Sequence, residues 1–243
     1  MAGFRSRIAA SARRRGSLVL ALDLPPAAPA SLARGAISHV RRLSPRICAI
    51  KLNMHLLLPL GAAQVARITA AAHDEGLEAI ADIKLNDIPS TNAAAAAALW
   101  DAGFDAVIAN PVMGPAALEA LAASAHSAGR GLIALCHMSS PEAAVSYELR
   151  AGRSALYSRF LGWALRAGAD GVVAGATYPE MVRYCARRAR GRLDIYSPGV
   201  GAQGGDPAEA YSAGTTYVIA GRSVLSARDP AAAAAALSRP ARA

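Results

Sequence analysis

Residues 78–88 read EAIADIKLNDI, and the fold that we predict for the chain is built outward from this segment. After Glu78 the segment is mainly apolar up to Leu85, and its two charged residues in that part, Asp82 and Lys84, stand two positions apart. Side chains alternate across a strand, so the two charged side chains share one face, whereas Ala81 and Ile83 point to the other. Because buried charges persist only when they are paired, the pattern predicts a strand that ends at a polar site inside the protein.

Seven other apolar runs of similar length lie along the chain, and an alanine-rich segment with helical signals follows each run. The eight runs begin near Ser17, Ile47, Glu78, Ala106, Gly131, Gly171, Leu193 and Tyr217. Strands that alternate with helices indicate parallel βαβ units. The length of 243 residues is close to the roughly 250 that one TIM barrel uses. We therefore predict an α/β protein that consists of a single (βα)8 TIM barrel.

The chain divides into a short leader and one barrel domain. Residues 1–16 contain five arginines and no acidic residue, and we expect them to form a basic N-terminal extension or short helix. An organellar transit peptide has a similar composition and is the alternative. Residues 17–243 should form the barrel, with the alanine-rich stretch 231–237 as its last helix. Pro89, Ser90 and Thr91 should open another helix, since proline is favoured at the first helical position.

The composition excludes several classes of protein. The net charge is +9, but aromatic residues make up only 5%, so the stacking platforms of single-strand nucleic-acid binders are missing and we expect no nucleic-acid partner. No apolar run reaches the roughly 20 residues that cross a bilayer, so we expect no membrane association. The scattered cysteines Cys48, Cys136 and Cys185 are typical of buried thiols in a reducing compartment. We therefore expect a cytoplasmic protein that binds small anions.

Active sites of TIM barrels lie at the C-terminal ends of the strands, and ionisable or small residues collect at these ends here. In chain order they are Asp23, Lys51, Asn53, Asp82, Lys84, Asp87, His137, Ser139, Thr177, the segment 197–206, Gly221 and Arg222. Such a concentration predicts a functional site at the mouth of the barrel.

The two lysines carry the strongest indication of chemistry. The chain has 26 basic residues, yet only Lys51 and Lys84 are lysines. Arginine does not release its proton in a protein, whereas a lysine can. A position that must give up a proton would therefore keep lysine in a chain that otherwise uses arginine. Both lysines stand at predicted strand ends, together with Asp23 and Asp82, although a purely structural pairing with these carboxylates would also explain them.

Residues 197–206 read SPGVGAQGGD and follow the seventh predicted strand, and Gly221 and Arg222 follow the eighth. TIM barrels frequently bind phosphate with the loops after these two strands, and an arginine suits bidentate contact with phosphate. Gln203 adds a side-chain donor. This end of the site is therefore predicted to bind a phosphate group, although a tight structural turn would also explain Gly204 and Gly205.

The sequence shows no clear pattern of metal-binding or cofactor-binding residues. The five histidines show no spacing typical of metal ligands, and the adjacent Cys136 and His137 suit barrel filling better than coordination. We expect a site that uses neither a metal ion nor a cofactor.

The stretch Asp82-Ile-Lys84-Leu-Asn-Asp87-Ile88 resembles the signature Asp-x-Lys-x-x-Asp-Ile of the orotidine 5′-monophosphate decarboxylase family, in its short archaeal form. Further matches in the same order are ALDLP around Asp23, IKLN around Lys51, MSSP around Ser139, SPGVGAQGGDP at 197–207 and GRS around Arg222. The resemblance spans nearly the whole chain. It implies a metal-free carboxy-lyase that converts orotidine 5′-monophosphate to uridine 5′-monophosphate (UMP) in pyrimidine synthesis.

The resemblance also implies roles for the cluster of charged residues. Lys84 would donate the proton to the ring carbon that loses carbon dioxide, and Asp82 would lie against the substrate carboxylate. Lys51 would orient Asp82 and contact the ribose, which Asp23 would also contact. Asp87 would complete the catalytic set from the partner subunit.

The remaining implied contacts are with the substrate. Asp87, Ile88 and Thr91 would reach into the partner's site, which makes the protein a homodimer with shared sites. Ser139 would contact the pyrimidine. The phosphate side would be formed by Pro198, Gly199, Val200, Gln203, Gly221 and Arg222.

Two alternatives remain at this point. A magnesium-dependent sugar-phosphate decarboxylase or aldolase of the same barrel group shares the Asp-x-Lys-x-x-Asp motif, but it needs additional acidic ligands, and the second strand offers Lys51 and no glutamate. A non-catalytic barrel that binds a phosphorylated ligand would keep the same pocket without turnover. Residues 139–153 are long enough for a lid over the site or for an ordinary surface insertion.

Overall fold

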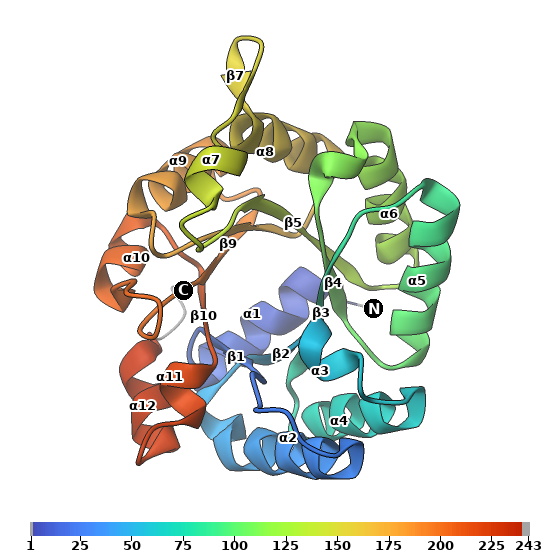
Figure 1. The fold of residues 1–243 in the computed structure, drawn as a ribbon, viewed down its shortest axis with the longest axis vertical. Coiled ribbons are helices and arrows are strands. Elements are labelled where there is room, and N and C mark those ends of the chain that lie inside the picture. The colour runs from blue at the N-terminus through green and yellow to red at the C-terminus, as the bar shows by residue number, and fades with distance from the viewer. Residues whose placement is uncertain (1, 240–243) are drawn as a thin grey trace.

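Eight parallel strands close into a barrel that helices surround in the computed structural model, which describes residues 2–239 (Figure 1). The strands follow the order β1-β10-β9-β8-β5-β4-β3-β2 around the barrel. Their bounds are β1 Leu18–Ala21, β2 Ala49–Asn53, β3 Glu78–Leu85, β4 Ala106–Ala109, β5 Gly131–His137, β8 Gly171–Ala174, β9 Asp194–Pro198 and β10 Tyr217–Ala220. Each begins within two residues of its predicted start, so the predicted (βα)8 barrel is confirmed.

The helices lie on the outside of the barrel, where they connect consecutive strands or follow the last one. They are α2 Pro29–Leu43, α3 Met54–Leu57, α4 Ala62–Asp74, α5 Pro89–Asp101, α6 Pro115–Ser127, α8 Leu156–Ala167, α9 Pro179–Ala189, α10 Pro207–Ala213, α11 Arg222–Leu225 and α12 Pro230–Leu237. Two 3-10 turns, η1 Ser44–Arg46 and η2 Pro111–Met113, lie between them. Many of these helices begin with proline, whose fixed φ angle suits the first helical position.

The arginine-rich N-terminal segment forms helix α1, Phe4–Arg15, which lies across the N-terminal end of the barrel (Figure 1). Phe4 and Ile8 are fully buried there. Arg5 pairs with Asp194 at 3.0 Å, and Arg7 pairs with Glu78 at 3.0 Å. The helix therefore closes the end of the barrel opposite the predicted site. Met1 and residues 240–243 of the two predicted segments lie outside the described residues.

The alternation of side chains along each strand divides the buried apolar residues into two clusters. Leu20, Ile50 and Ala81 belong to the apolar cluster between strands and helices. Their neighbours along the strands, such as Ala49 and Ile80, belong to the cluster that includes the barrel interior. This period of two brings every second strand residue into the barrel, where the last ones form the site.

The insertion between β5 and α8 contains a short helix, α7 Ala143–Ser146, and a hairpin of β6 Arg150–Ala151 with β7 Ser154–Ala155. Figure 1 shows the hairpin projecting away from the barrel. No helix within residues 2–239 is long and apolar enough to cross a membrane.

Candidate active site

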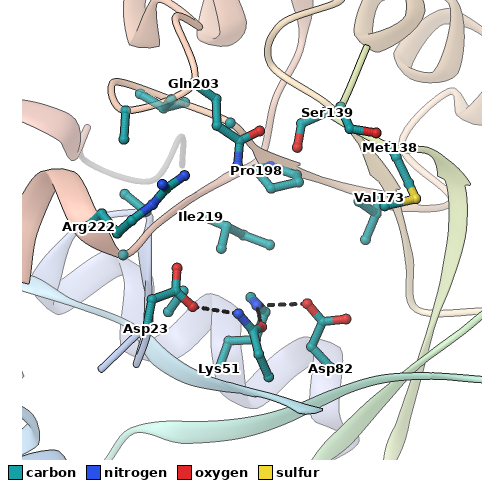
Figure 2. A pocket seen from close by; sticks show the side chains of 18 of the residues that line it. Asp23, Lys51, Asp82, Met138, Ser139, Val173, Pro198, Gln203, Ile219 and Arg222 are labelled. Carbon is teal, nitrogen blue, oxygen red and sulfur yellow. Dashed lines mark hydrogen bonds and ion pairs between the residues drawn. The ribbon is translucent and has the colours of Figure 1, made fainter. Parts of the chain in front are cut away.

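A cavity of about 260 Å³ opens at the C-terminal ends of the barrel strands. We call it the pocket. Eleven of the predicted site residues line it: Asp23, Lys51, Asp82, Lys84, Ser139, Pro198, Gly199, Val200, Gln203, Gly221 and Arg222. Figure 2 shows Arg222 and Gln203 at one end of the pocket and Lys51 and Asp82 deeper within it. The structure therefore brings together residues that are up to 199 positions apart in the sequence (222 − 23).

A continuous chain of hydrogen bonds joins the charged residues on the floor of the pocket. Lys51 Nζ donates to Asp82 Oδ2 at 2.7 Å, and Lys84 Nζ donates to Asp82 Oδ1 at 2.9 Å. Lys51 also donates to Asn53 Oδ1, and the Asn53 amide donates to Asp23 Oδ1. Each oxygen of the Asp82 carboxylate thus holds one ammonium group in a fixed place.

Strand register explains how these residues meet. Ala21 lies opposite Lys51 across β1 and β2, and Asn53 lies opposite Asp82 across β2 and β3. Since residues of one parity share a face, these neighbours present their side chains to the same side of the sheet. The backbone pairing alone thus assembles most of the charged cluster.

Lys84 also lines the pocket, but the backbone that carries it is less regular. The pairing of β3 with β4 is in register up to Ala81 and resumes only at Leu85, so β3 is irregular between them. Lys84 itself has a φ angle of +49°, a left-handed conformation that non-glycine residues adopt rarely and at a cost of about 1–3 kcal/mol. The sequence suggested that side chains alternate regularly at both Asp82 and Lys84. The structure confirms this for Asp82, whereas the backbone at Lys84 departs from regular strand geometry.

The charges differ in their access to solvent. The Lys51 side chain is 5% exposed and that of Asp82 is 11% exposed, whereas that of Lys84 is 41% exposed and open to the pocket. Burial alone would raise the pKa of Asp82, but the two neighbouring ammonium groups and their hydrogen bonds lower it overall. Asp82 is therefore a carboxylate at neutral pH. The floor of the pocket presents a negative charge next to a positive one that has access to a bound molecule.

An apolar wall lies beside the charged cluster, and sequence reasoning did not single out its members. Ile108, Leu135, Val173 and Ile219 come from β4, β5, β8 and β10 and line the pocket (Figure 2 labels the last two). They occupy the inward-facing positions at the ends of their strands, so strand alternation could have located them. A wall of this kind lowers the local dielectric constant and strengthens the interactions of the charges beside it.

The glycine-rich loop after β9 forms a compact turn at the other end of the pocket. Gly205 N–H donates to Gly199 O at 3.0 Å, and Gly201 N–H donates to Gly205 O at 2.9 Å. Gly199 has a φ angle of +97°, and a Cβ atom there would lie 2.8 Å from Ser139 Cβ. The loop therefore packs closely on the segment after β5, while Gln203 and Arg222 point toward the pocket (Figure 2).

Three predicted site residues are not part of the pocket. Asp87, Ile88 and Thr91 lie at the start of α5. Asp87 Oδ1 accepts from Ile88 N–H at 2.7 Å, and Ile88 is 63% exposed. Within one copy of the chain, these residues therefore face solvent rather than the site.

The predicted segment 139–153 begins at the pocket with Ser139 and continues into α7 and the hairpin. His137, just before it, is fully buried, and its Nε2 atom lies 3.3 Å from Glu148 Oε1. Across residues 2–239, no group of three or more His, Cys, Asp or Glu side chains is arranged to hold a metal ion.

Comparison with known proteins places this geometry in a family. Residues 16–237 match the model of the orotidine 5′-phosphate decarboxylase / HUMPS family. The orotidine 5′-phosphate decarboxylase of Halorhodospira halophila is 38% identical over 90% of this chain and 93% of its own length. That of Pyrococcus furiosus is 32% identical over 80% and 86%, respectively. A solved orotidine 5′-monophosphate decarboxylase from Methanocaldococcus jannaschii, complexed with the inhibitor BMP, is 27% identical with a TM-score of 0.78, covering 91% of this chain and 96% of that one.

Proposed function

This chain belongs to the orotidine 5′-phosphate decarboxylase / HUMPS family, and from that premise we propose how its pocket converts orotidine 5′-monophosphate to UMP in pyrimidine synthesis. The single observation that carries the proposal is the Lys51–Asp82–Lys84 cluster at the strand ends. It lies beside an apolar wall, and the guanidinium group of Arg222 lines another part of the same pocket.

The substrate's charges set its orientation. Its phosphate binds at Arg222 and Gln203, because a guanidinium group and an amide both donate to phosphate oxygens. Its ribose lies over Asp23 and Lys51, and its pyrimidine lies beside Ser139. The carboxylate that leaves as carbon dioxide then points at Asp82. Pro198, Gly199, Val200 and Gly221 shape the phosphate end.

The chemistry needs a proton and a place for negative charge. The bond between the ring carbon and the carboxylate breaks, the electron pair stays on the ring carbon, and carbon dioxide leaves. The Lys84 ammonium, held by Asp82 at 2.9 Å, stabilises the carbanion and then donates its proton to that carbon. Preorganised charge of this kind is frequently the largest contribution to catalysis. The like charge of Asp82 disfavours the carboxylate of the bound substrate and so favours its loss as carbon dioxide.

The active form that we propose is a homodimer in which Asp87, Ile88 and Thr91 reach the partner's site. Exposed apolar side chains on consecutive strand-end connections support a covered surface here: Met54 on α3, Leu58 after it, Ile88 before α5 and Val112 in η2. Large apolar side chains that are exposed on neighbouring loops commonly mark an interface. The cysteines Cys48, Cys136 and Cys185 are buried free thiols, which fits the reducing cytoplasm that we propose as the location.

The test is the loss of orotidine 5′-monophosphate absorbance with purified protein, with and without EDTA. We expect turnover that EDTA does not change. Turnover that needs magnesium would instead identify a sugar-phosphate type of site, and tight substrate binding without turnover would identify a non-catalytic barrel. Lys84→Ala should lose turnover in the same assay and still bind UMP in a separate calorimetric titration.

A further inference from the structure

The imidazole ring of His137 lies at the end of β5, next to the pocket but outside it. Pairing of β5 with β8 is regular up to Leu135 and Val173, and the next pair is His137 with Ala174, so one residue of β5 is extra. This irregularity accompanies a change of face. Leu135 and Met138 line the pocket, whereas the side chain of His137 is fully buried behind it.

Two hydrogen-bonding contacts fix the ring. His137 Nδ1 lies 2.9 Å from the carbonyl oxygen of Met138. A carbonyl oxygen can only accept, so Nδ1 carries a proton and donates it. The Nε2 atom lies 3.3 Å from Glu148 Oε1, in the insertion after β5. The rings of Tyr147, Tyr157 and Tyr178 surround the imidazole at centroid distances of 5.9, 6.2 and 4.6 Å.

The carbonyl that His137 holds belongs to the residue directly before Ser139, and both Met138 and Ser139 line the pocket. The next two carbonyls in this segment are also held from the side, because Thr177 Oγ1 donates to Ser139 O at 2.9 Å and Tyr178 Oη donates to Ser140 O at 3.2 Å. Of the three donors, only the one from His137 precedes Ser139 in the chain. The backbone just before Ser139 is also held by the Gly175 N–H, which donates to His137 O at 3.2 Å. The side chain of His137 therefore helps to fix the peptide through which the backbone reaches Ser139.

We propose that His137 is a positioning residue for recognition of the pyrimidine, acting through the Met138 carbonyl on Ser139. The inference rests on the orientation proposed above, in which the base lies at Ser139 and the phosphate at Arg222. His137 itself touches no substrate atom. Because it acts at one end of the pocket, it should affect ligands that contain the base and leave ligands that contain only the sugar phosphate unchanged.

Two substitutions separate this role from general packing. In His137→Asn, the amide nitrogen can take the place of Nδ1 and still donate to Met138 O. In His137→Gln, the amide reaches the place of Nε2 and the donor to Met138 is lost. Both variants lose the aromatic packing against the tyrosines, so both should unfold at a lower temperature than the wild type.

The experiment measures the binding of UMP and of ribose 5-phosphate to each full-length variant by calorimetry. Loss of one hydrogen bond should weaken UMP about fivefold to tenfold in His137→Gln, with ribose 5-phosphate unchanged and with near wild-type UMP binding in His137→Asn. An unchanged ratio of the two affinities in His137→Gln, or an equal loss in both variants, would overturn the proposal.

Two controls make the outcome specific. His126 forms a second histidine–carboxylate pair, more exposed and far from Ser139, with Asp170 at 3.0 Å, and Asp170 also accepts from Leu132 N–H at the other end of β5. His126→Asn should leave the ratio of UMP to ribose 5-phosphate affinity unchanged. Ser139→Ala should weaken UMP alone. If Ser139→Ala weakens UMP binding and His137→Gln does not, the proposed role of His137 is wrong but the proposed orientation of the base stands. If Ser139→Ala has no effect on UMP binding, both the orientation of the base and the role of His137 are refuted.

Discussion

The carboxylate of Asp23 lies so close to the backbone of Gly221 that a Cβ atom at position 221 would overlap it. Asp23 follows β1 and Gly221 follows β10, and these two strands pair in parallel. Gly221 also directly precedes Arg222, at the phosphate end of the pocket. The absence of a side chain at position 221 therefore allows the ribose-side carboxylate and the phosphate-side arginine to occupy the same corner.

Gly221→Ala should consequently disturb both ends of substrate binding. The added methyl group must displace the Asp23 carboxylate, and we expect kcat/KM to fall about tenfold, which corresponds to about 1.4 kcal/mol of lost transition-state binding. Steady-state decarboxylation kinetics measure the effect. Gly162→Ala is the matched control, because a Cβ atom there meets no atom within 4 Å. A kcat/KM for Gly221→Ala within twofold of the Gly162→Ala value would contradict this prediction. It would show that the Asp23 side chain can move aside without loss of activity.

The shared site predicts complementation between two inactive variants. Lys84→Ala removes the proton donor of its own site, and Asp87→Asn removes the carboxylate that we propose enters the partner's site. A hybrid dimer has one site with both residues intact and one site with neither. After subunit exchange in an equal mixture, half of the dimers are hybrids, so activity should reach about a quarter of the wild-type value. Activity no higher than the mean of the two parents would contradict shared sites.

Much of the site could be predicted from sequence because it depends on local pattern. The run before Asp82 has strand length, and the period of two that brings Asp82 inward also applies to Lys51 on the neighbouring strand. Both positions depend on nothing beyond a parallel strand and its direction. The same rule places Ile108 and Val173 on the inward face, so their positions could also be predicted from the sequence.

The features of the site that could not be predicted from the sequence arise from the way in which neighbouring strands pair. The irregular register of β3 against β4, and the φ angle of +49° at Lys84, arise from the fit of two distant segments and leave no local signal in the sequence. The extra residue before His137 has the same origin. For this reason the sequence suggested that His137 fills the barrel, whereas the structure places it behind the pocket wall.

A pH-dependent contribution to stability should come from the pair of His73 and Asp105, whose side chains are 2.8 Å apart at the end of the barrel opposite the pocket. The hydrogen bond to Asp105 raises the pKa of His73. A raised pKa in the folded state means that the stabilisation is complete below about pH 6.5, the unfolded value, and is lost as the pH rises through the folded value.

His73→Gln should therefore destabilise the protein more at pH 6 than at pH 9. Because the His73 side chain is 40% exposed, solvent screening should keep the effect below about 1 kcal/mol. Urea denaturation of both proteins at the two pH values measures the free energy of unfolding. A larger difference at pH 9 than at pH 6 would contradict the assignment.

Lys84→Arg separates the two tasks of the lysine, which are to supply positive charge and to release a proton. An arginine keeps the charge beside Asp82 but does not give up its proton in a protein. If proton donation is essential, decarboxylation should fall by about 10²–10⁴-fold while UMP still binds. Lys84→Ala, measured in parallel, removes both the charge and the proton and should be at least as slow. Retention of a tenth or more of wild-type turnover by Lys84→Arg would mean that charge alone is sufficient and that the proton comes from another group. The buried Lys51, 2.7 Å from Asp82, would then be the next residue to substitute.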